Sequence, residues 1–437
     1  MKTTHDQKIS QRHSRRILKI AAIAMGLVVF SIPLLGCAIP GHVQADTLAT
    51  PGKIKEGVQY EDVSDAFRQS LWEFAGKTTG AALAVQTGKN SLYSPTSLYY
   101  ALAMLEAGAA NKTKTDLRSF MEIPESLQIG GELRDLYALM TLDAERAAEQ
   151  VANAIWFRED LLSDSQKWIK QEWLDQLSND FYASAFSVDF SNPESSKRMS
   201  RWVEEQTKGK IKPDIDVSDP LLLIVLMNTL YFKADWVMPF SRDLISQKSF
   251  HGLTGEIKDV DYLQGTFRSL EALTSDRFQA CALPLANGQI DFVLPKAGIS
   301  PEELLNDPAL LLTLKDGERE GFDVDFLLPK FSYRTKIDIL KSMDKLGLKS
   351  VLADRPDFSA MFNLDAEVSA ITQETFIALD ENGLEAAAYT EIQMGFGSMP
   401  DQLERIEMTL DRPFIYVISD DAGAPLFVGI VNNPLAG

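Results

Sequence analysis

The chain has 437 residues, of which 45% are hydrophobic and 24% are charged. This composition is typical of a soluble globular protein with enough apolar side chains for a sizeable core. The net charge of −19 gives a surface that repels phosphate backbones, so the sequence predicts neither nucleic-acid binding nor a polyanionic cofactor.

Residues 1–37 have the pattern of a targeting segment. A basic region precedes an apolar run from Ile20 to Leu35, which is short for a membrane-spanning helix. The run ends in Leu34-Leu35-Gly36-Cys37, which resembles the lipobox of bacterial lipoproteins, where the cysteine carries the lipid. This resemblance implies export and a lipid anchor at Cys37. A signal-peptidase site at Val43-Gln44-Ala45, a weak twin-arginine signal at Ser14-Arg15-Arg16 and a retained membrane helix stay open as alternatives.

The rest of the chain is predicted to be a tether followed by one large domain. Residues 38–60 contain repeated Pro and Gly, which favours a flexible tether. Residues 61–437 contain no long linker, repeat or low-complexity tract. If Cys37 is lipidated, Cys281 is the only other cysteine and no intramolecular disulfide can form.

The first half of this domain is predicted to be mostly helical and the second half mostly strands. Ser94-Pro95 is a capping pair for a helix through Glu106, and a second helix is predicted over Met199–Lys208. Helices followed by strands favour an α+β domain. The predicted strands are Leu221–Phe232, Gln279–Leu285, Asp291–Leu294, Asp323–Leu328, Thr375–Leu379, Ile406–Leu410, Phe414–Ser419 and Leu426–Val431.

Residues that carry catalysis are scarce. Of the four histidines, only His251 lies within residues 61–437, so that region has few ligands for zinc and no second histidine for a nucleophilic site. Gly76-Lys77-Thr78 resembles the end of a phosphate-binding loop, but Leu71 stands where that loop needs a glycine. No carboxylate pair stands out, although a glycosidase stays open as an alternative. We therefore expect no enzyme, no metal and no cofactor.

The segment from Gly383 to Gly397 alternates with a period of two residues. One face carries Leu384, Ala386, Ala388, Thr390, Ile392, Met394 and Phe396. The pattern is that of a strand with one buried face, but the small residues and the glycine-rich end are typical of an exposed loop. The segment is therefore interpreted as a strand held in reserve. An ordinary edge strand, and a short helix over Ala386–Ala388, are the alternatives.

A series of local patterns extends over nearly all of residues 61–437, and their order and spacing resemble the serpins. The patterns are Asn90-x-x-x-Ser94-Pro95-x-Ser97, Ala101-Leu102-Ala103-Met104-Leu105 with Gly108-Ala109, Ala152-Asn153, Val188-Asp189-Phe190, Trp202 to Ile211, Asn228-x-x-Tyr231-Phe232-Lys233-x-x-Trp236, Leu328-Pro329-Lys330-Phe331, Phe358-Ser359-x-Met361, Asp380-Glu381-Asn382-Gly383, Asp411-Arg412-Pro413-Phe414 and Gly429-x-Val431-x-Asn433-Pro434.

This resemblance implies the serpin fold, with about nine helices around three mostly antiparallel sheets and an exposed reactive loop beginning at Glu381. In inhibitory members a serine protease attacks the loop and forms an acyl-enzyme. The first half of the loop then inserts into the main sheet as a new central strand, which distorts the trapped protease.

The resemblance also assigns roles to particular residues. Gly383 is implied to be the pivot, with Leu384 and the small residues Ala386, Ala387 and Ala388 completing the hinge. Glu381 is implied to pair with Lys330 near Trp236, at the end of the sheet where the loop enters. Ser94, Ser97, Asn228 and Gln373 are implied to line the region where the strands part. Gln373 stands where the family usually has histidine, and bulky Leu384 replaces a small Thr or Ser.

The position of the cleaved bond is left open by the length of the loop. Counting from the hinge places the bond between Gly397 and Ser398, whereas counting back from Pro413-Phe414 places it near Gln402, and Phe396 and Met399 are chemically plausible. No Lys or Arg lies between Glu391 and Glu404, which favours an elastase-, subtilisin- or chymotrypsin-like target over a trypsin-like one.

The sequence therefore predicts an exported, extracellular or surface-anchored monomer that inhibits serine proteases as a suicide substrate and can cross-react with cysteine proteases. The alternative is a non-inhibitory serpin whose loop is merely cleaved, or which binds a partner.

Overall fold

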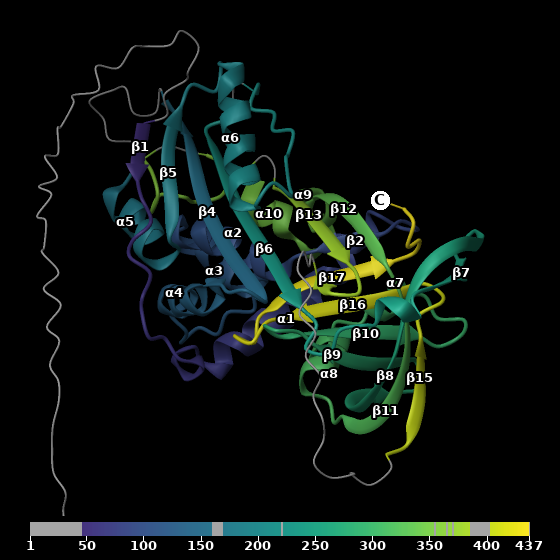
Figure 1. Ribbon diagram of the computed structural model, residues 1–437. Coiled ribbons are helices and arrows are strands. Elements are labelled where there is room, and N and C mark those ends of the chain that lie inside the picture. Colours follow the sequence, from purple (N-terminus) through teal and green to yellow (C-terminus); the bar gives the residue numbers. More distant parts are fainter. Residues whose placement is uncertain are drawn as a thin grey trace, which may run out of the picture. The chain divides into compact units, whose positions relative to one another are not determined.

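A computed structural model of the protein (Figure 1) describes residues 46–159, 169–219, 222–353, 355–363, 366–368, 371–384 and 403–436. Ten α-helices occur within these ranges. They are α1 (Asp65–Ala84), α2 (Pro95–Gly108), α3 (Asn111–Phe120), α4 (Ile129–Met140), α5 (Gln171–Asp180), α6 (Pro193–Gln206), α7 (Pro301–Leu305), α8 (Ala309–Asp316), α9 (Ile339–Ser342) and α10 (Leu348–Ala353). None of these helices has the length and apolarity needed to cross a membrane.

The first sheet, called sheet A, has β14 as a two-residue strand between two long neighbours. In spatial order its strands are β1 (Asp46–Ala49), β5 (Ala183–Val188), β4 (Ala147–Arg158), β6 (Ile224–Asp235), β14 (Gly383–Leu384), β13 (Thr372–Leu379) and β12 (Phe331–Asp338), and β3 (Leu142–Asp143) pairs with β4. β4 pairs with β6 along nearly its whole length, and β12 with β13 likewise.

The second sheet, called sheet B, is built around the 20-residue strand β8. In spatial order its strands are β15 (Arg405–Thr409), β11 (Glu320–Pro329), β8 (Gly255–Thr274), β9 (Phe278–Pro284), β10 (Gln289–Pro295), β16 (Phe414–Ser419), β17 (Pro425–Val431) and β2 (Ser91–Tyr93), and β7 (Ser246–Gly252) pairs with β8. Since β8 pairs with β11 and also with β9, the described residues form two sheets where the sequence resemblance implied three.

Helix α2 lies between the two sheets and is buried along almost its full length (Figure 1). The Ser94 side chain accepts a hydrogen bond from the Ser97 N–H, and Pro95 occupies the first turn, so the helix begins where the sequence predicted. Helix α6 packs on the opposite, outer face of sheet A, where Met199 and Val203 contact a small apolar cluster that includes Trp156 and Met227.

The segment before the first helix differs from its prediction. Residues 38–60 were expected to form a flexible tether, but Asp46–Ala49 pairs with β5 as an edge strand. Gly52 N–H donates to the Ser178 carbonyl at 3.0 Å, and Lys55 N–H donates to the Tyr182 hydroxyl at 3.0 Å. The open edge of β5 offers unpaired backbone groups, and residues 46–49 satisfy them. The tether prediction is therefore wrong for residues 46–55.

Candidate functional site

The candidate site is the end of sheet A where β14 lies between β6 and β13. Leu384 is opposite Ala234 on β6 and opposite Leu379 on β13, and both pairings are antiparallel. Beyond Leu384 the described parts of β6 and β13 are not paired with each other. Sheet A is therefore joined at one end of this gap and parted along the rest of it.

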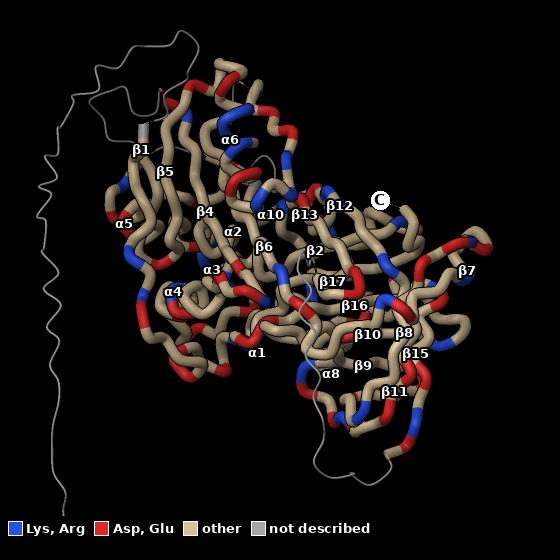
Figure 2. The backbone as a smooth tube through the Cα atoms, viewed as in Figure 1, with Lys and Arg blue, Asp and Glu red and all other residues tan. Residues whose placement is uncertain are grey.

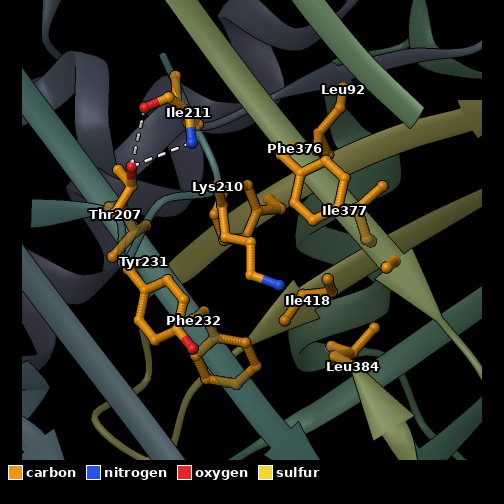
Figure 3. A pocket seen from close by; sticks show the side chains of 13 residues that line it. Leu92, Thr207, Lys210, Ile211, Tyr231, Phe232, Phe376, Ile377, Leu384 and Ile418 are labelled. Atoms are coloured by element: carbon orange, nitrogen blue, oxygen red, sulfur yellow. Dashed lines mark hydrogen bonds between the residues drawn. The ribbon is translucent and has the colours of Figure 1, made fainter. Parts of the chain in front are cut away.

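A narrow cavity of about 30 Å³ occupies the gap below Leu384. Figure 3 shows Leu384 at one end of it and the Lys210 side chain pointing between Tyr231 and Phe376. The walls are Leu230, Tyr231 and Phe232 of β6 and Phe376, Ile377 and Ala378 of β13. The space is sufficient for a water molecule, whereas a strand needs about 4.8 Å to each neighbour, so the strands must separate further before one can enter.

Basic residues after α6 lie over the outer side of this gap (Figure 2). Lys208 Nζ lies 5.1 Å from the Tyr231 ring centre, and Lys210 Nζ lies 5.8 Å from the Phe376 ring centre. Such cation–aromatic contacts are weakly attractive at exposed sites. Lys210 was not among the predicted site residues, because its role depends on its position over two strands that are distant in sequence.

The turn that leads into β14 is bound tightly to its surroundings. Trp236, which is 1% exposed, donates its indole N–H to the Asp380 carbonyl and its backbone N–H to the Asn382 carbonyl, both at 2.9 Å. Lys330 Nζ donates to Glu381 Oε2 at 2.8 Å, so the pairing that the family resemblance implied is present. Arg242, which the sequence did not single out, contacts Glu381 Oε1 at 3.0 Å.

The charges around Glu381 keep it ionised. Burial raises the pKa of Glu381, but the hydrogen bond from Lys330 and the charges of Lys330 and Arg242 outweigh burial, so the pKa lies below its usual value. The turn is therefore held by an ion pair at neutral pH.

Gly383 is required by a close approach of two backbones. Its φ is +151°, and a Cβ atom at this position would lie 2.3 Å from the Ala234 carbonyl oxygen of β6. No other residue fits this contact without displacing β14 or β6.

The residues predicted to line the parting region converge on the start of α2. Gln373 of β13 accepts from Ser94 N–H and donates to the Ser94 carbonyl, each at 2.8 Å. The Ser97 hydroxyl donates to Asn228 Oδ1 of β6. Asn228 in turn donates to Asn153 Oδ1 of β4 at 2.6 Å. The start of α2 is thus hydrogen-bonded to both sides of the gap.

Asn153 also belongs to this network, although in the sequence it stood out only as part of the motif Ala152-Asn153. Its side chain is 2% exposed and donates to the Phe181 carbonyl at 2.7 Å. The signal that could have identified it is a buried amide within an apolar strand, since such a group needs hydrogen-bonding partners.

The remaining predicted site residues lie outside the described ranges. These are Cys37, Ala386, Ala387, Ala388, Phe396, Gly397, Ser398 and Met399. Their roles stay predictions.

Within the described ranges, no three His, Cys, Asp or Glu side chains are placed to hold a metal ion. Burial, followed by the nearby charge of Asp291, raises the pKa of the Cys281 thiol to about 12, which leaves it protonated and unreactive at neutral pH.

The comparisons with known proteins agree with this geometry. The family model described as Serpin (serine protease inhibitor) matches residues 69–434. An uncharacterized serpin-like protein of Thermococcus kodakarensis is 28% identical over 395 residues, which cover 88% of each chain. Alpha-1-antiproteinase S of Cavia porcellus is 25% identical, and the match covers 95% of this chain and 99% of that protein.

Solved structures show the same fold. The thermophilic serpin tengpin in its native state superposes with a TM-score of 0.74 at 23% identity, covering 90% of this chain and all of tengpin. Serpin48 of the insect Tenebrio molitor gives a TM-score of 0.70 at 25% identity, covering 85% and 98% of the two chains. The match over residues 69–434, together with the fold, shows that this chain belongs to the serpin family of protease inhibitors.

Proposed function

We propose that this serpin is a suicide inhibitor of serine proteases, in which the cleaved loop inserts into sheet A between β6 and β13. A protease would attack the loop, form an acyl-enzyme and be carried along as the loop inserts. The observation that carries the proposal is the position of β14, which is hydrogen-bonded to both β6 and β13 and continues directly into residues 385–402.

The pairing of β14 defines where each following residue would go. If the two registers continue past Leu384, every even-numbered position of the inserted strand would lie on the inner face, as Leu384 does. Continuing them inward, Ala386 would face Phe232 and Ile377, Ala388 would face Leu230 and Thr375, and Thr390 would face Asn228 and Gln373. Small residues would therefore enter the apolar part of the gap, and Thr390 would reach the polar network at the start of α2.

The outward positions match their new neighbours as well. Glu385 would be opposite Lys233 of β6, and a cross-strand pair of opposite charges is favourable. Ala387 would be placed between Tyr231 and Phe376, beneath Lys210, where only a small side chain avoids displacing the lysine. This supports an inserted strand with even positions inward.

The bulk of Leu384, which stands where the family usually has Thr or Ser, would slow insertion if this side chain entered the sheet only after cleavage. In the structure it is 2% exposed and already packed between the two strands. Leu384 is therefore already buried before cleavage, and its position requires no further separation of β6 and β13. This observation favours inhibition over the alternative of a serpin that is only a substrate.

The target class is proposed from the loop composition. Without Lys or Arg between Glu391 and Glu404, the loop offers apolar and small residues to the specificity pocket of a protease. Elastase-, subtilisin- and chymotrypsin-like enzymes accept such residues.

The test is to incubate the purified protein with elastase, subtilisin and chymotrypsin and to separate the products on denaturing gels. A covalent adduct at the summed mass supports inhibition, and mass spectrometry of the released C-terminal peptide identifies the cleaved bond. Cleavage by all three enzymes without any adduct would show that the protein is a substrate.

A matched pair of variants tests the inserted register. Ala388→Arg places a charge on the inward face opposite Leu230 and should abolish the adduct while leaving cleavage intact. Tyr389→Arg lies on the outward face opposite Glu374 and should retain the adduct. Equal adduct yields from both variants would contradict insertion in this register.

We also propose that the chain is exported and anchored through lipid on Cys37. The support is the signal-like segment 1–37. Cys37→Ala should move the protein from the membrane fraction to the soluble fraction of the producing cells. If the wild-type protein is found only in the medium and begins after Ala45, the chain is secreted instead.

A further inference from the structure

Two carboxyl groups lie buried between the two sheets, one strand away from the gap, since Glu149 of β4 pairs with Phe232 of β6. Glu149 of β4 is 1% exposed, and Asp420, in the turn between β16 and β17, is 6% exposed. In each group one oxygen accepts a hydrogen bond from a neutral donor. Asn287 donates to Glu149 Oε2 and Ala424 N–H donates to Asp420 Oδ1, both at 2.7 Å. The remaining oxygens, Glu149 Oε1 and Asp420 Oδ2, have no donor from other groups.

The two carboxyl groups interact with each other. The two side chains are within hydrogen-bonding range, so a hydrogen bond between them exists only when one carboxyl group holds a proton. With both groups ionised, two negative charges would lie in contact in a buried site, which is strongly unfavourable.

The surroundings supply no compensating ion pair. Among the described residues, neither Glu149 nor Asp420 forms a salt bridge. The titratable groups that interact with the pair are Asp421 of the same turn and Tyr100 of α2, and Arg68 of α1 binds the turn at Ala422. The Arg68 guanidinium donates to the carbonyl oxygens of Ala422, Val63 and Tyr60. The extra charge of Asp421 makes ionisation of the pair still less favourable.

The pair also connects parts of the molecule that must shift during insertion. β4 is paired with β6 from Ala147–Ala234 to Phe157–Ile224, so these two strands move together. Asp420 and Asn287 belong to turns of sheet B. Inserting a strand widens the β6–β13 gap by about 4.8 Å, which displaces the β4–β6 side relative to its neighbours. Glu149 is therefore placed to resist that displacement.

We propose that Glu149 and Asp420 share one proton that ties the β4–β6 side of sheet A to the turns of sheet B, and that loss of this proton loosens the native state and speeds loop insertion. The first half of this proposal is independent of the proposed inhibitory function, whereas the second half rests on it.

The direction of the pH dependence follows from burial. Burial, followed by the charge and hydrogen bond of Asp420, raises the pKa of Glu149 well above its usual value, and burial raises the pKa of Asp420 to about 6. The unfolded chain releases these protons near pH 4, whereas the folded chain retains one to higher pH. Unfolding therefore releases a proton, and the unfolding equilibrium constant increases by about tenfold for each pH unit until the folded pair also ionises.

The first experiment compares urea-induced unfolding of the full chain between pH 5 and pH 8. The wild type should lose stability as the pH rises. Glu149→Gln keeps an amide that can donate to Asp420 but cannot ionise, so its unfolding midpoint should change far less over this range. Glu56→Gln, which alters an acid that is 80% exposed and remote from the pair, should behave like the wild type. If Glu149→Gln does not fold, Asp420→Asn provides the same comparison.

An equal pH slope in the wild type and in both pair variants would overturn the proposal. A divalent cation is the other occupant that two carboxylates could hold, so the series is repeated with calcium chloride and with EDTA. If calcium raises the wild-type midpoint at pH 8 and has no effect on Glu149→Gln, the pair binds a cation and the proton-sharing proposal is wrong.

The second experiment measures how fast the uncleaved protein loses its capacity to form a protease adduct at pH 5 and pH 8. The wild type should lose it several-fold faster at pH 8, and Glu149→Gln should show similar rates at both. Equal wild-type rates would overturn the link to insertion while leaving the proton-sharing result in place. If no protease gives an adduct at either pH, the proposed inhibitory function fails, and the unfolding experiment still decides whether the proton is shared.

Discussion

At the scale of single residues, the hinge depends on two neighbours with opposite requirements. Leu384 is large and fills the space between β6 and β13, whereas Gly383 must have no side chain because of the Ala234 carbonyl. The family resemblance implied a pivot at Gly383, where a glycine is free to change its φ and ψ angles. The structure adds a second reason, the close approach of the backbones, which no local pattern in the sequence contains.

Gly383→Ala tests this close approach. The added Cβ atom would displace β14, so the variant should lose about 1–3 kcal/mol of stability and should form less protease adduct. Thermal unfolding and adduct yield measure the two effects. Gly209→Ala is a matched control, because Gly209 also has a positive φ of +82° but nothing lies within 4 Å of an added Cβ atom. Equal losses in both variants would mean that backbone strain, not the contact with β6, explains Gly383.

At the scale of elements, the strands that follow the sequence pattern are those with continuous apolar or alternating residues. The segments predicted as Phe414–Ser419, Thr375–Leu379 and Leu426–Val431 correspond to β16, β13 and β17 with boundaries that differ by no more than three residues. Their buried, β-branched and aromatic residues carry the signal. The second half of the chain was therefore predictable in outline.

Strands of the first half were missed because their stability is not local. β4 begins Ala147-Ala148-Glu149-Gln150, which has neither a β-branched run nor clear alternation, and it is stabilised by pairing with β5 and β6 on either side. β1 is four residues long and exists through the open edge of β5. Pairing partners distant in sequence decide such cases, and propensity contributes little.

The network at the start of α2 was predictable in most of its members, Asn153 excepted, but not in its connections. Ser94, Ser97, Asn228 and Gln373 were implied to line the parting region by family resemblance. That Gln373 bonds both backbone groups of Ser94 follows from the placement of β13 beside α2, which spacing in the sequence does not reveal.

Gln373→Leu removes both of these hydrogen bonds and leaves the Ser94 N–H and carbonyl without them. An unpaired buried polar group costs about 1–3 kcal/mol, so the variant should unfold at a lower temperature. Because β13 would also be freed from α2, the sheet should part more readily and the uncleaved protein should lose inhibitory capacity faster. Thr372→Ala, at an exposed neighbouring position on β13, serves as the control. A Gln373→Leu protein as stable as this control would show that the network does not hold the strand.

At the scale of the whole molecule, the described structure leaves sheet A incomplete. The facing edges of β6 and β13 have backbone groups that pair with β14 over only two residues. An inserted strand of the loop would add on the order of ten ladder hydrogen bonds, each contributing about 1 kcal/mol net, and would bury the even-numbered side chains. While the loop is connected at both ends it reaches this arrangement only slowly, so cleavage should release the chain rapidly into a more stable fold.

Cleavage within the loop should therefore raise the thermal stability of the protein instead of lowering it. A gain of about 10 kcal/mol corresponds to an increase in Tm of roughly 12 °C for a domain of about 400 residues, because each kcal/mol shifts the Tm of such a domain by about 1.2 °C. The measurement compares thermal unfolding, followed by circular dichroism, of the intact protein and of protein nicked by a catalytic amount of elastase.

Ala388→Arg separates the effect of strand insertion from the effect of cutting the loop, since it is cleaved in the same loop but carries a charge that cannot enter the gap beside Leu230. Its Tm should stay near that of the intact chain after cleavage. A wild-type protein whose Tm also stays unchanged would mean that cutting the loop does not complete sheet A, and β14 would then be a fixed edge of the gap and not the first step of insertion.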